Sequence, residues 1–572
     1  MLTPTWKKYE KYIEQDMSCC KKKILIFSHG NKPIEDMIKQ KHHDVVLVKI
    51  DDRFCQTDGS NFIARANEND FLHIFKTVSD IDKILYISTT TDSQTFYDSD
   101  SLTIHLAFFK FLLDVKSDKT IDVTVVTNNA CSVLPEEPIN PYQSAVLGMF
   151  KCMIWETPSI NYHCVDINYN SSKSLIAKQI LFPDESFLIA IRNNNRYLEE
   201  INFINKNKYK VCDTSIKENG VYLICGGLGR LGMIISDWIS KQANTTIISI
   251  GRSSFPPRET WDNISKETSL DSIKKIEMIR TIEGRGSYFY YYSVDIGQDN
   301  QLHNFIDQIY DQYGKIDGIF QCAVDDFQMS ISSLNEQLFQ ESINAKVLAT
   351  ENLYSVLKGK EFDFFLLFSS VMTLIGGKSN ITYVAANSYL DNFVINKENV
   401  FVINWPEWEG VGLDSNKMID ESISIFKKIN KENAMIILDT VLKMKLKRTI
   451  VGKANLGSPI FKLKKKLPLS FAININDTLK ENNEEEDNLD NIKITLLGRD
   501  SKKYSQKEID IAKVWGAVFG YSELNINNNY FDIGGDSITA FKMQVLFEKM
   551  GLPITAADIL RHQTIETLAA AI

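Results

Sequence analysis

The sequence predicts an α/β protein with two consecutive α/β halves, followed by a small bundle of helices. Two observations lead to this prediction. Over residues 1–460, short apolar runs that end in turn residues alternate with longer segments of helical period, which is the pattern of strands alternating with helices. Over residues 504–572, the apolar residues fall in stripes at helical spacing instead, which is typical of a small bundle.

The first half, residues 1–212, is predicted to be a structural unit. Its candidate strands are Lys23–Phe27, Lys83–Ile87 and Val123–Val126. The first of these strands ends in Ser28-His29-Gly30-Asn31, which lacks the glycines that allow a backbone to approach a pyrophosphate. We therefore expect a nucleotide-binding architecture that has no nucleotide site.

The second half, residues 213–460, repeats the alternation with those glycines present. Val221–Cys225 is a continuous apolar run, as expected of a strand buried on both faces. The motif Gly227-x-Gly229-x-x-Gly232 follows at once, and then an apolar helix-like segment, Met233–Ile239. Such a loop before a helix N-terminus binds the phosphates of dinucleotides. The predicted fold is therefore α/β with two Rossmann-like halves, a structural pseudo-Rossmann half and a catalytic half that binds the cofactor, before a four-helix bundle.

The residues after the next two predicted strands indicate which dinucleotide binds. Thr246–Ile250 ends in Gly251-Arg252-Ser253. An acidic residue at this place holds the ribose 2′-hydroxyl of NAD, whereas an arginine pairs with the 2′-phosphate of NADP, so we expect NADPH. The strand Tyr290–Val294 ends in Asp295-Ile296, placed to hydrogen-bond an adenine edge. The predicted cofactor-binding residues are Gly227, Gly229, Arg230, Leu231, Gly232, Arg252, Ser253, Asp295 and Ile296.

Four residues downstream of the glycine loop form the predicted catalytic set: Lys346, Ser370, Tyr383 and Asn387. A hydride that arrives at a carbonyl carbon leaves negative charge on oxygen, which needs a proton donor and a hydrogen-bonding partner. Tyr383 is the predicted acid, and Lys346, expected within a helix, lowers the pKa of its phenol. Ser370 ends an apolar strand and donates to the oxygen. Asn387 lies one helical turn after Tyr383 and orders water or holds the lysine.

The composition limits the partners and the compartment. The chain has 572 residues and a net charge of −9, which argues against nucleic acid or an anionic membrane as main partner. The N-terminus is too polar for a secretory signal, and no apolar run approaches the length of a membrane span. Nine cysteines occur without a Cys-x-x-Cys pair, so we expect reduced thiols, no metal site and a cytoplasmic location.

The C-terminal part is predicted to be a flexible linker, residues 461–503, and an independent bundle, residues 504–572. Glu481–Asn488 is acidic and has no apolar face to bury, as expected of a linker; a solvated helix end is the alternative. Three apolar stripes predict the helices of the bundle: Ile509, Ile511, Ala512, Trp515, Val518 and Phe519; Ile538, Phe541, Val545 and Leu546; and Ile565, Leu568 and Ala569.

The segment Phe531-Asp532-Ile533-Gly534-Gly535-Asp536-Ser537-Ile538 resembles the phosphopantetheine attachment site of carrier proteins. The resemblance covers residues 505–572 and implies that Ser537 carries a 4′-phosphopantetheine arm. Gly-Gly-Asp-Ser after Tyr-Phe-Asp is closer to peptidyl carriers than to many acyl carriers. The alternative is that Ser537 only caps a helix.

The spacing of the catalytic set resembles extended short-chain dehydrogenase/reductases, and most closely the ketoreductase domains of modular polyketide synthases. The common short-chain enzymes have a lysine four residues after the tyrosine, whereas this chain has Asn387 there and Lys346 upstream, the arrangement of synthase ketoreductases. The family's first half is a structural subdomain without a cofactor site, as predicted above. Asn404-Trp405-Pro406 resembles the version in synthases whose acyltransferase is a separate protein.

One segment departs from the family pattern, and two other sites bear on the stereochemistry of the product. Gln321-Cys322-Ala323-Val324 stands where the family usually has His-Ala-Ala-Gly. Asp325-Asp326 is similar to the Leu-Asp-Asp mark of one stereochemical class, in a shifted register, and Ile375 stands where the opposite class has tryptophan. Asp325-Asp326 and Ile375 favour the D-hydroxy product.

The two resemblances together imply an NADPH-dependent ketoreductase joined to a carrier domain, in a polyketide or hybrid polyketide/nonribosomal peptide assembly line. The substrate is expected to be a β-ketoacyl thioester on Ser537, reduced to the β-hydroxyacyl thioester. An α-ketoacyl reductase of a depsipeptide synthetase is one alternative, and an inactive reductase that serves as a carrier scaffold is another. The implied partners are the carrier-bound acyl group, other synthase domains or modules and a phosphopantetheinyl transferase. We find no condensing, acyltransferase or adenylating signature, so we expect loading from elsewhere or a longer polypeptide.

Overall fold

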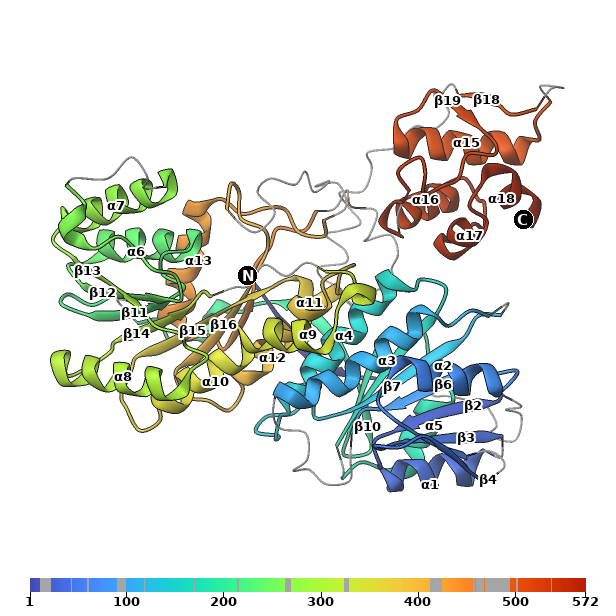
Figure 1. Ribbon diagram of the computed structural model, residues 1–572, viewed down its shortest axis with the longest axis horizontal. Coiled ribbons are helices and arrows are strands. Elements are labelled where there is room, and N and C mark those ends of the chain that lie inside the picture. The colour runs from blue at the N-terminus through green and yellow to red at the C-terminus, as the bar shows by residue number, and fades with distance from the viewer. Residues whose placement is uncertain are drawn as a thin grey trace.

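The structure is a computed structural model of the 572-residue chain, shown in Figure 1. It describes residues 1–10, 22–42, 44–58, 61–89, 99–117, 119–168, 170–212, 215–262, 269–323, 329–411, 424–455, 458, 468, 494–499, 503–535 and 537–572. The expected linker segment Glu481–Asn488, the pair Cys19-Cys20 and the pair Asp325-Asp326 lie outside the described residues.

The first half contains a mainly parallel sheet. Its strands pair in the order β4-β5-β3-β2-β6-β7-β8-β9. The bounds are β2 Ile24–Ser28, β3 Val45–Ile50, β4 Cys55–Asp58, β5 Asn61–Ala64, β6 Lys83–Ile87, β7 Asp122–Asn128, β8 Asn161–Ile167 and β9 Leu188–Arg192. The helices of this half are α1 Lys32–Lys41, α2 Glu68–Thr77, α3 Thr103–Leu113, α4 Pro141–Glu156 and α5 Lys173–Leu181.

The second half contains a parallel sheet in the order β13-β12-β11-β14-β15-β16-β17. The strands β12 and β13 lie on one side of β11, and the strands from β14 onward lie on its other side. The strand order therefore switches between β11 and β14, which is where doubly wound folds bind ligands. The strand bounds are β11 Val221–Cys225, β12 Thr246–Gly251, β13 Tyr288–Ser293, β14 Gly318–Gln321, β15 Phe364–Ser370, β16 Val400–Trp405 and β17 Arg448–Ile450. The helices are α6 Arg230–Gln242, α7 Leu270–Glu283, α8 Asp299–Tyr313, α9 Glu336–Asn344, α10 Val347–Val356, α11 Met372–Ile375, α12 Ile381–Phe393 and α13 Lys431–Met444.

The two sheets are joined into one by the N-terminal strand. β1 (Leu2–Lys8) pairs antiparallel with β10 (Asn195–Phe203) on one side and, at Leu2, with Ile450 of β17 on the other. Helices α4 and α12 cross between the halves, and Figure 1 shows them with α9 and α11 at the centre of the molecule. Their crossing is close, because a Cβ on Gly148 would lie 2.4 Å from Ser388 Oγ. The halves therefore share one hydrophobic core, which contains Val146 and Val384.

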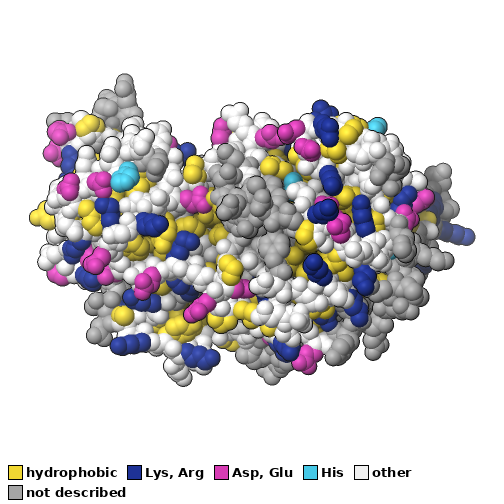
Figure 2. Space-filling view, turned by 90° about the horizontal axis from the view of Figure 1, so that it is seen from below, with side chains coloured by type: hydrophobic (Ala, Val, Ile, Leu, Met, Phe, Trp, Pro, Cys, Tyr) yellow, Lys and Arg dark blue, Asp and Glu magenta, His cyan; other side chains and the backbone are white. Residues whose placement is uncertain are grey.

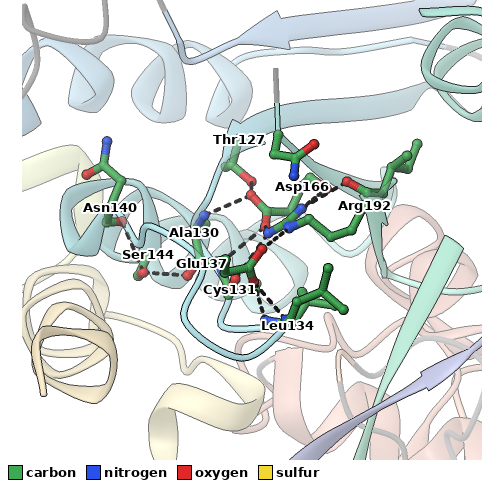
Figure 3. Close-up of polar contacts among 12 residues, drawn as sticks. Thr127, Ala130, Cys131, Leu134, Glu137, Asn140, Ser144, Asp166 and Arg192 are labelled. Carbon is green, nitrogen blue, oxygen red and sulfur yellow. Dashed lines mark hydrogen bonds and ion pairs between the residues drawn. The ribbon is translucent and has the colours of Figure 1, made fainter. Parts of the chain in front are cut away.

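A buried ion-pair network fixes the loop that leads into α4 (Figure 3). Arg192 is fully buried, and its guanidinium donates to Asp166 Oδ2 and to Glu137 Oε2, each at 2.6 Å. Asp166 also accepts the backbone N–H groups of Ala130 and Cys131, at 2.9 and 3.2 Å. The network lies at the carboxyl ends of β7 and β8, and it positions the start of α4.

Among its described residues, the C-terminal part has four helices and a short pair of parallel strands. These elements are β18 Thr495–Leu497, α15 Gln506–Phe519, β19 Glu523–Asn525, α16 Ser537–Lys549, α17 Ala556–Arg561 and α18 Ile565–Ala571. Trp515 is fully buried, and its ring meets that of Tyr530 edge to face at 5.4 Å. The predicted class, two Rossmann-like halves and a four-helix region, is confirmed. The three-residue strands were not predicted.

The described residues have a surface of mixed charge and free cysteines. On the face drawn in Figure 2, Lys and Arg side chains stand among Asp and Glu side chains. All seven described cysteines are free, and five are buried, including Cys225 and Cys322. Burial raises the pKa of both of these thiols. Among the described residues, no helix has the length and hydropathy of a membrane span, and no cluster of His, Cys, Asp and Glu has a metal-binding arrangement.

Candidate active site

The glycine loop follows β11 and leads into α6. Gly226 has φ +78°, and α6 begins with Gly229 at its N-cap and no side-chain cap. A Cβ on Gly227 would lie 2.0 Å from Ser249 Oγ, and one on Gly232 would lie 2.5 Å from the Cα of Gly227. The absence of side chains lets the loop pack against β12 and leaves the first N–H groups of α6 open to a ligand.

A cleft of about 1720 Å³ opens beside this loop at the carboxyl ends of the strands. All the predicted cofactor-binding residues line it except Gly227, which faces Ser249 and has a packing role. Lys275 on α7 also lines the cleft and forms an ion pair of 2.5 Å with Asp271. No sequence motif identified Lys275. Asp295 accepts the N–H of Gly297 at 2.9 Å, so one of its carboxylate oxygens is engaged locally.

Lys346, Ser370 and Tyr383 line the same cleft, and Asn387 lies directly behind them, fully buried. Lys346 Nζ donates to Asn387 Oδ1 at 2.7 Å, and Asn387 Nδ2 donates to the carbonyl oxygen of Tyr383 at 2.8 Å. Lys346 Nζ lies 5.7 Å from the centroid of the Tyr383 ring. The asparagine therefore connects the lysine to the helical turn that begins at the tyrosine.

Lys346 was expected within a helix, and this prediction is wrong. Lys346 is the N-cap of α10, with φ −121° and ψ −45°, immediately after α9 ends. The helical segments α9 and α10 are thus separated at the cleft. Both segments have a helical pattern in the sequence, so the sequence did not predict the break between them. Lys346 is 5% exposed. Burial lowers the pKa of its ammonium to about 8, although the Asp391 carboxylate opposes this shift.

Ser370 is the last residue of β15, as predicted, and its Oγ accepts the N–H of Met372 at 3.2 Å. A buried polar network lies behind it. Asp391 accepts from Ser369 Oγ at 2.6 Å and from Arg448 at 2.8 Å. Asn404 Nδ2 lies 2.8 Å from Asp391 Oδ1 and 3.1 Å from the carbonyl oxygen of Ser370. Sequence reasoning missed this network because its members come from β15, α12, β16 and β17.

Ser537 and Ile375 were also singled out in the sequence. Ser537 is the first residue of α16, after Gly534 with φ +99°. Ile375, at the end of α11, lines the cleft, and its carbonyl oxygen accepts the indole N–H of Trp155 at 2.7 Å. The stereochemical prediction that used Asp325-Asp326 falls outside the described residues.

Comparison with protein families finds two matches. Residues 220–410 match the family described as KR domain, and residues 510–572 match the family described as phosphopantetheine attachment site. Both predicted resemblances are confirmed. The second match includes Ser537, and the first includes the glycine loop and the four residues of the predicted catalytic set.

Known proteins agree with these assignments. Over 209 residues the chain is 28% identical to a 6-methylsalicylic acid synthase of Penicillium expansum, an alignment that covers 35% of this chain and 11% of the synthase. The fold is similar to that of an N-terminal ketoreductase from the macrolactin assembly line (TM-score 0.64, 18% identity, 80% of this chain and 91% of that one). It is also similar to a structure of adenylation, ketoreductase and pseudo Asub domains from a keto acid-selecting NRPS module (TM-score 0.67, 18% identity, 79% and 39% of the two chains).

Proposed function

We propose that this chain, which carries a KR domain and a phosphopantetheine attachment domain, is an NADPH-dependent reductase of a β-ketoacyl thioester tethered to Ser537. The product is the β-hydroxyacyl thioester. The observation that carries the proposal is that Lys346, Ser370 and Tyr383 line the cleft that the glycine loop also lines. The proposal includes a structural subdomain (residues 1–212), a catalytic subdomain (213–460), a linker (461–503) and a carrier domain (504–572).

The residues that line the cleft suit the pyrophosphate and the 2′-phosphate of NADPH. The uncapped N-terminus of α6 offers N–H groups and the positive end of the helix dipole to a pyrophosphate. Arg252 and Ser253 follow β12 and would hold the 2′-phosphate, with Lys275 as a second cation of the same cleft. When bound, NADPH supplies the hydride for the carbonyl carbon.

The chain's own residues manage the charge on the carbonyl oxygen. In this proposal Tyr383 gives its phenolic proton to the oxygen while the Ser370 hydroxyl donates a hydrogen bond to it. The Lys346 ammonium stabilises the resulting phenolate, which regains a proton from solvent. Asn387 holds the ammonium at 2.7 Å. One ketone, one hydride and one proton give one alcohol, so the step balances.

The attachment domain supplies the substrate in this proposal. A phosphopantetheinyl transferase would modify Ser537, and other synthase domains or modules would load the acyl group. A tether replaces diffusive capture with a high local concentration at the cleft. Because the alignments cover only about a tenth of each synthase's length, these partners remain proposals, as does the cytoplasmic location.

A second substrate class, an α-ketoacyl thioester, is favoured by the peptidyl character of the Gly534–Ser537 motif. The similar fold within a keto acid-selecting NRPS module points the same way. The test offers the purified protein β-keto and α-keto pantetheine thioesters with NADPH and follows nicotinamide absorbance. We expect faster oxidation of NADPH with the β-keto compound. Faster turnover of the α-keto compound would assign the depsipeptide activity, and activity with neither would favour the scaffold.

A further inference from the structure

The first half contributes a side chain to the cleft. Trp155, the penultimate residue of α4, lines the cleft together with Ser370 and Tyr383. It is the one residue of the first half among the described residues that line the cleft, and 220 positions separate it from Ile375, to which it binds. A half that holds no phosphate loop thus reaches into the site of the other half.

Helix α4 holds the segment that connects Ser370 to Tyr383 at three points. Trp155 Nε1 donates to the carbonyl oxygen of Ile375 at 2.7 Å. One turn earlier, Lys151 Nζ donates to the carbonyl oxygen of Thr373 at 2.8 Å. The N–H of Ser379 donates to Glu156 Oε1 at 2.7 Å. These contacts fix the segment 371–380 against α4, so the indole has a defined place beside it.

The backbone of α4 packs closely against the second half at two glycines. Gly376 has φ +75°, and a Cβ there would lie 2.5 Å from the backbone carbonyl of Lys151. On the other side, Gly148 packs directly on Ser388 of the helix that carries Tyr383. Trp155 is 3% exposed, so only a small part of the residue borders the cleft, held by the surrounding structure.

The place of Trp155 in the cleft indicates which ligand it meets. The glycine loop and the residues after β12 line the cleft, and Trp155 is hydrogen-bonded to the segment between Ser370 and Tyr383. A ketone that accepts a proton from Tyr383 and a hydrogen bond from Ser370 would lie beside the segment that joins these two residues. An indole edge is a rigid apolar wall for an acyl chain.

We propose that Trp155 is a specificity-determining residue, which limits the acyl chain and sets the face of the ketone that is presented to the hydride. This inference rests on the proposed ketoreductase function. It assigns to the first half a direct role in substrate selection, in addition to support of the second half. The expected ligand is the apolar part of a ketoacyl thioester.

The test compares Trp155→Leu with Phe150→Leu. Phe150 is fully buried on the same helix and does not line the cleft, so its variant controls for loosening of α4. For Trp155→Leu we expect the KM of a short β-ketoacyl pantetheine thioester to rise about tenfold. The kcat/KM for longer acyl chains should rise relative to that for short ones, and the ratio of the two alcohol enantiomers should change. The KM for NADPH should stay unchanged. Trp155→Phe, which keeps a ring but loses the N–H donor, serves as the milder variant.

The outcomes separate the inference from the function on which it rests. If wild-type protein reduces ketoacyl thioesters and both leucine variants alter turnover equally, with enantiomer ratio and chain-length preference unchanged, Trp155 is only structural and the inference is overturned. If Trp155→Leu does not fold, the enantiomer ratio of Trp155→Phe decides between the same two results. If wild-type protein reduces no ketoacyl thioester, the proposed function fails, and the inference is overturned with it.

Discussion

Lys346 Nζ and Asn387 Oδ1 form a hydrogen bond of 2.7 Å between residues that are 41 positions apart. Both residues are buried, and burial lowers the pKa of the ammonium to about 8. A buried ammonium is costly unless a partner accepts its hydrogen bonds. Asn387 supplies the acceptor without adding a negative charge, so it raises the pKa of the lysine less than a carboxylate would.

The pKa of Lys346 predicts a pH dependence. The ammonium is lost as pH rises through about 8, so the reduction rate should fall on the alkaline side as the phenolate of Tyr383 loses its stabilising charge. Asn387→Leu removes an acceptor from the charged form and should move this alkaline limb to lower pH, whereas Asn387→Asp should move it to higher pH. The pH profile of kcat measures both shifts. Three overlapping profiles would show that the pair does not control the titration.

The same pKa predicts a stability change. The folded-state pKa of Lys346, about 8, is below the ordinary value of 10.5, so the unfolded chain binds more protons between these two values. Stability should therefore rise with pH through this window. Lys346→Met should remove this rise, which amounts to about 3 kcal/mol for a pKa lowered from 10.5 to about 8. Urea unfolding of both proteins across the window measures the difference, and parallel pH curves would contradict the prediction.

Tyr383→Phe should reduce kcat by about 100-fold or more, because the phenolic proton contributes at the level of general acid catalysis. Binding of NADPH should be unchanged. Tyr288→Phe, on a side chain that is 64% exposed, is the control. Steady-state rates with a β-keto pantetheine thioester and fluorescence titration of NADPH provide the two measurements. Full activity in Tyr383→Phe would remove the tyrosine from the chemistry.

Arg252→Ala should raise the KM for NADPH by about tenfold or more while leaving the KM for NADH nearly unchanged, because a charged hydrogen bond to the 2′-phosphate is lost. Arg280→Ala is a matched control, since Arg280 pairs with Asp262 and does not line the cleft. An equal effect on both coenzymes would show that Arg252 does not read the phosphate.

Asp166→Asn should destabilise the first half by about 3–5 kcal/mol, because it removes one carboxylate from the fully buried Arg192. Asp122→Asn breaks the ion pair with Lys22, whose side chain is half exposed, and should cost about 1 kcal/mol or less. Chemical denaturation with a probe in the first half measures both. Since the network holds the loop before α4, Asp166→Asn should also lower reductase activity at elevated temperature. Equal unfolding midpoints for the two variants would contradict this account.

Features encoded in short segments of the sequence were predicted from it. The run Val221–Cys225 and the glycine loop after it predicted a buried strand, a turn and a helix, and the structure has β11, the turn at Gly226 and α6 there. Burial on both faces and the need for glycine are local properties of the sequence. The one-turn spacing of Tyr383 and Asn387 predicted a shared helix face, and both lie on α12. The catalytic roles of these residues stay predictions until the experiments above are done.

Features that depend on long-range packing were not predicted. The break at Lys346 lies between two segments that both favour helix. Trp155 reaches the cleft only because two glycines let α4 approach the second half closely. Nothing in the residues around Trp155 signals this contact, because its partner is 220 positions away.

The most direct test of the account is the intact mass of the carrier-loaded protein. A transferase would load Ser537 with a β-ketoacyl phosphopantetheine arm, and Ser537→Ala would serve as the unloaded control. We predict that NADPH adds the mass of two hydrogen atoms to the loaded wild-type protein and none to loaded Tyr383→Phe. A fully loaded wild-type protein whose mass stays unchanged after NADPH is added would contradict the central claim that this chain reduces a ketone tethered to itself.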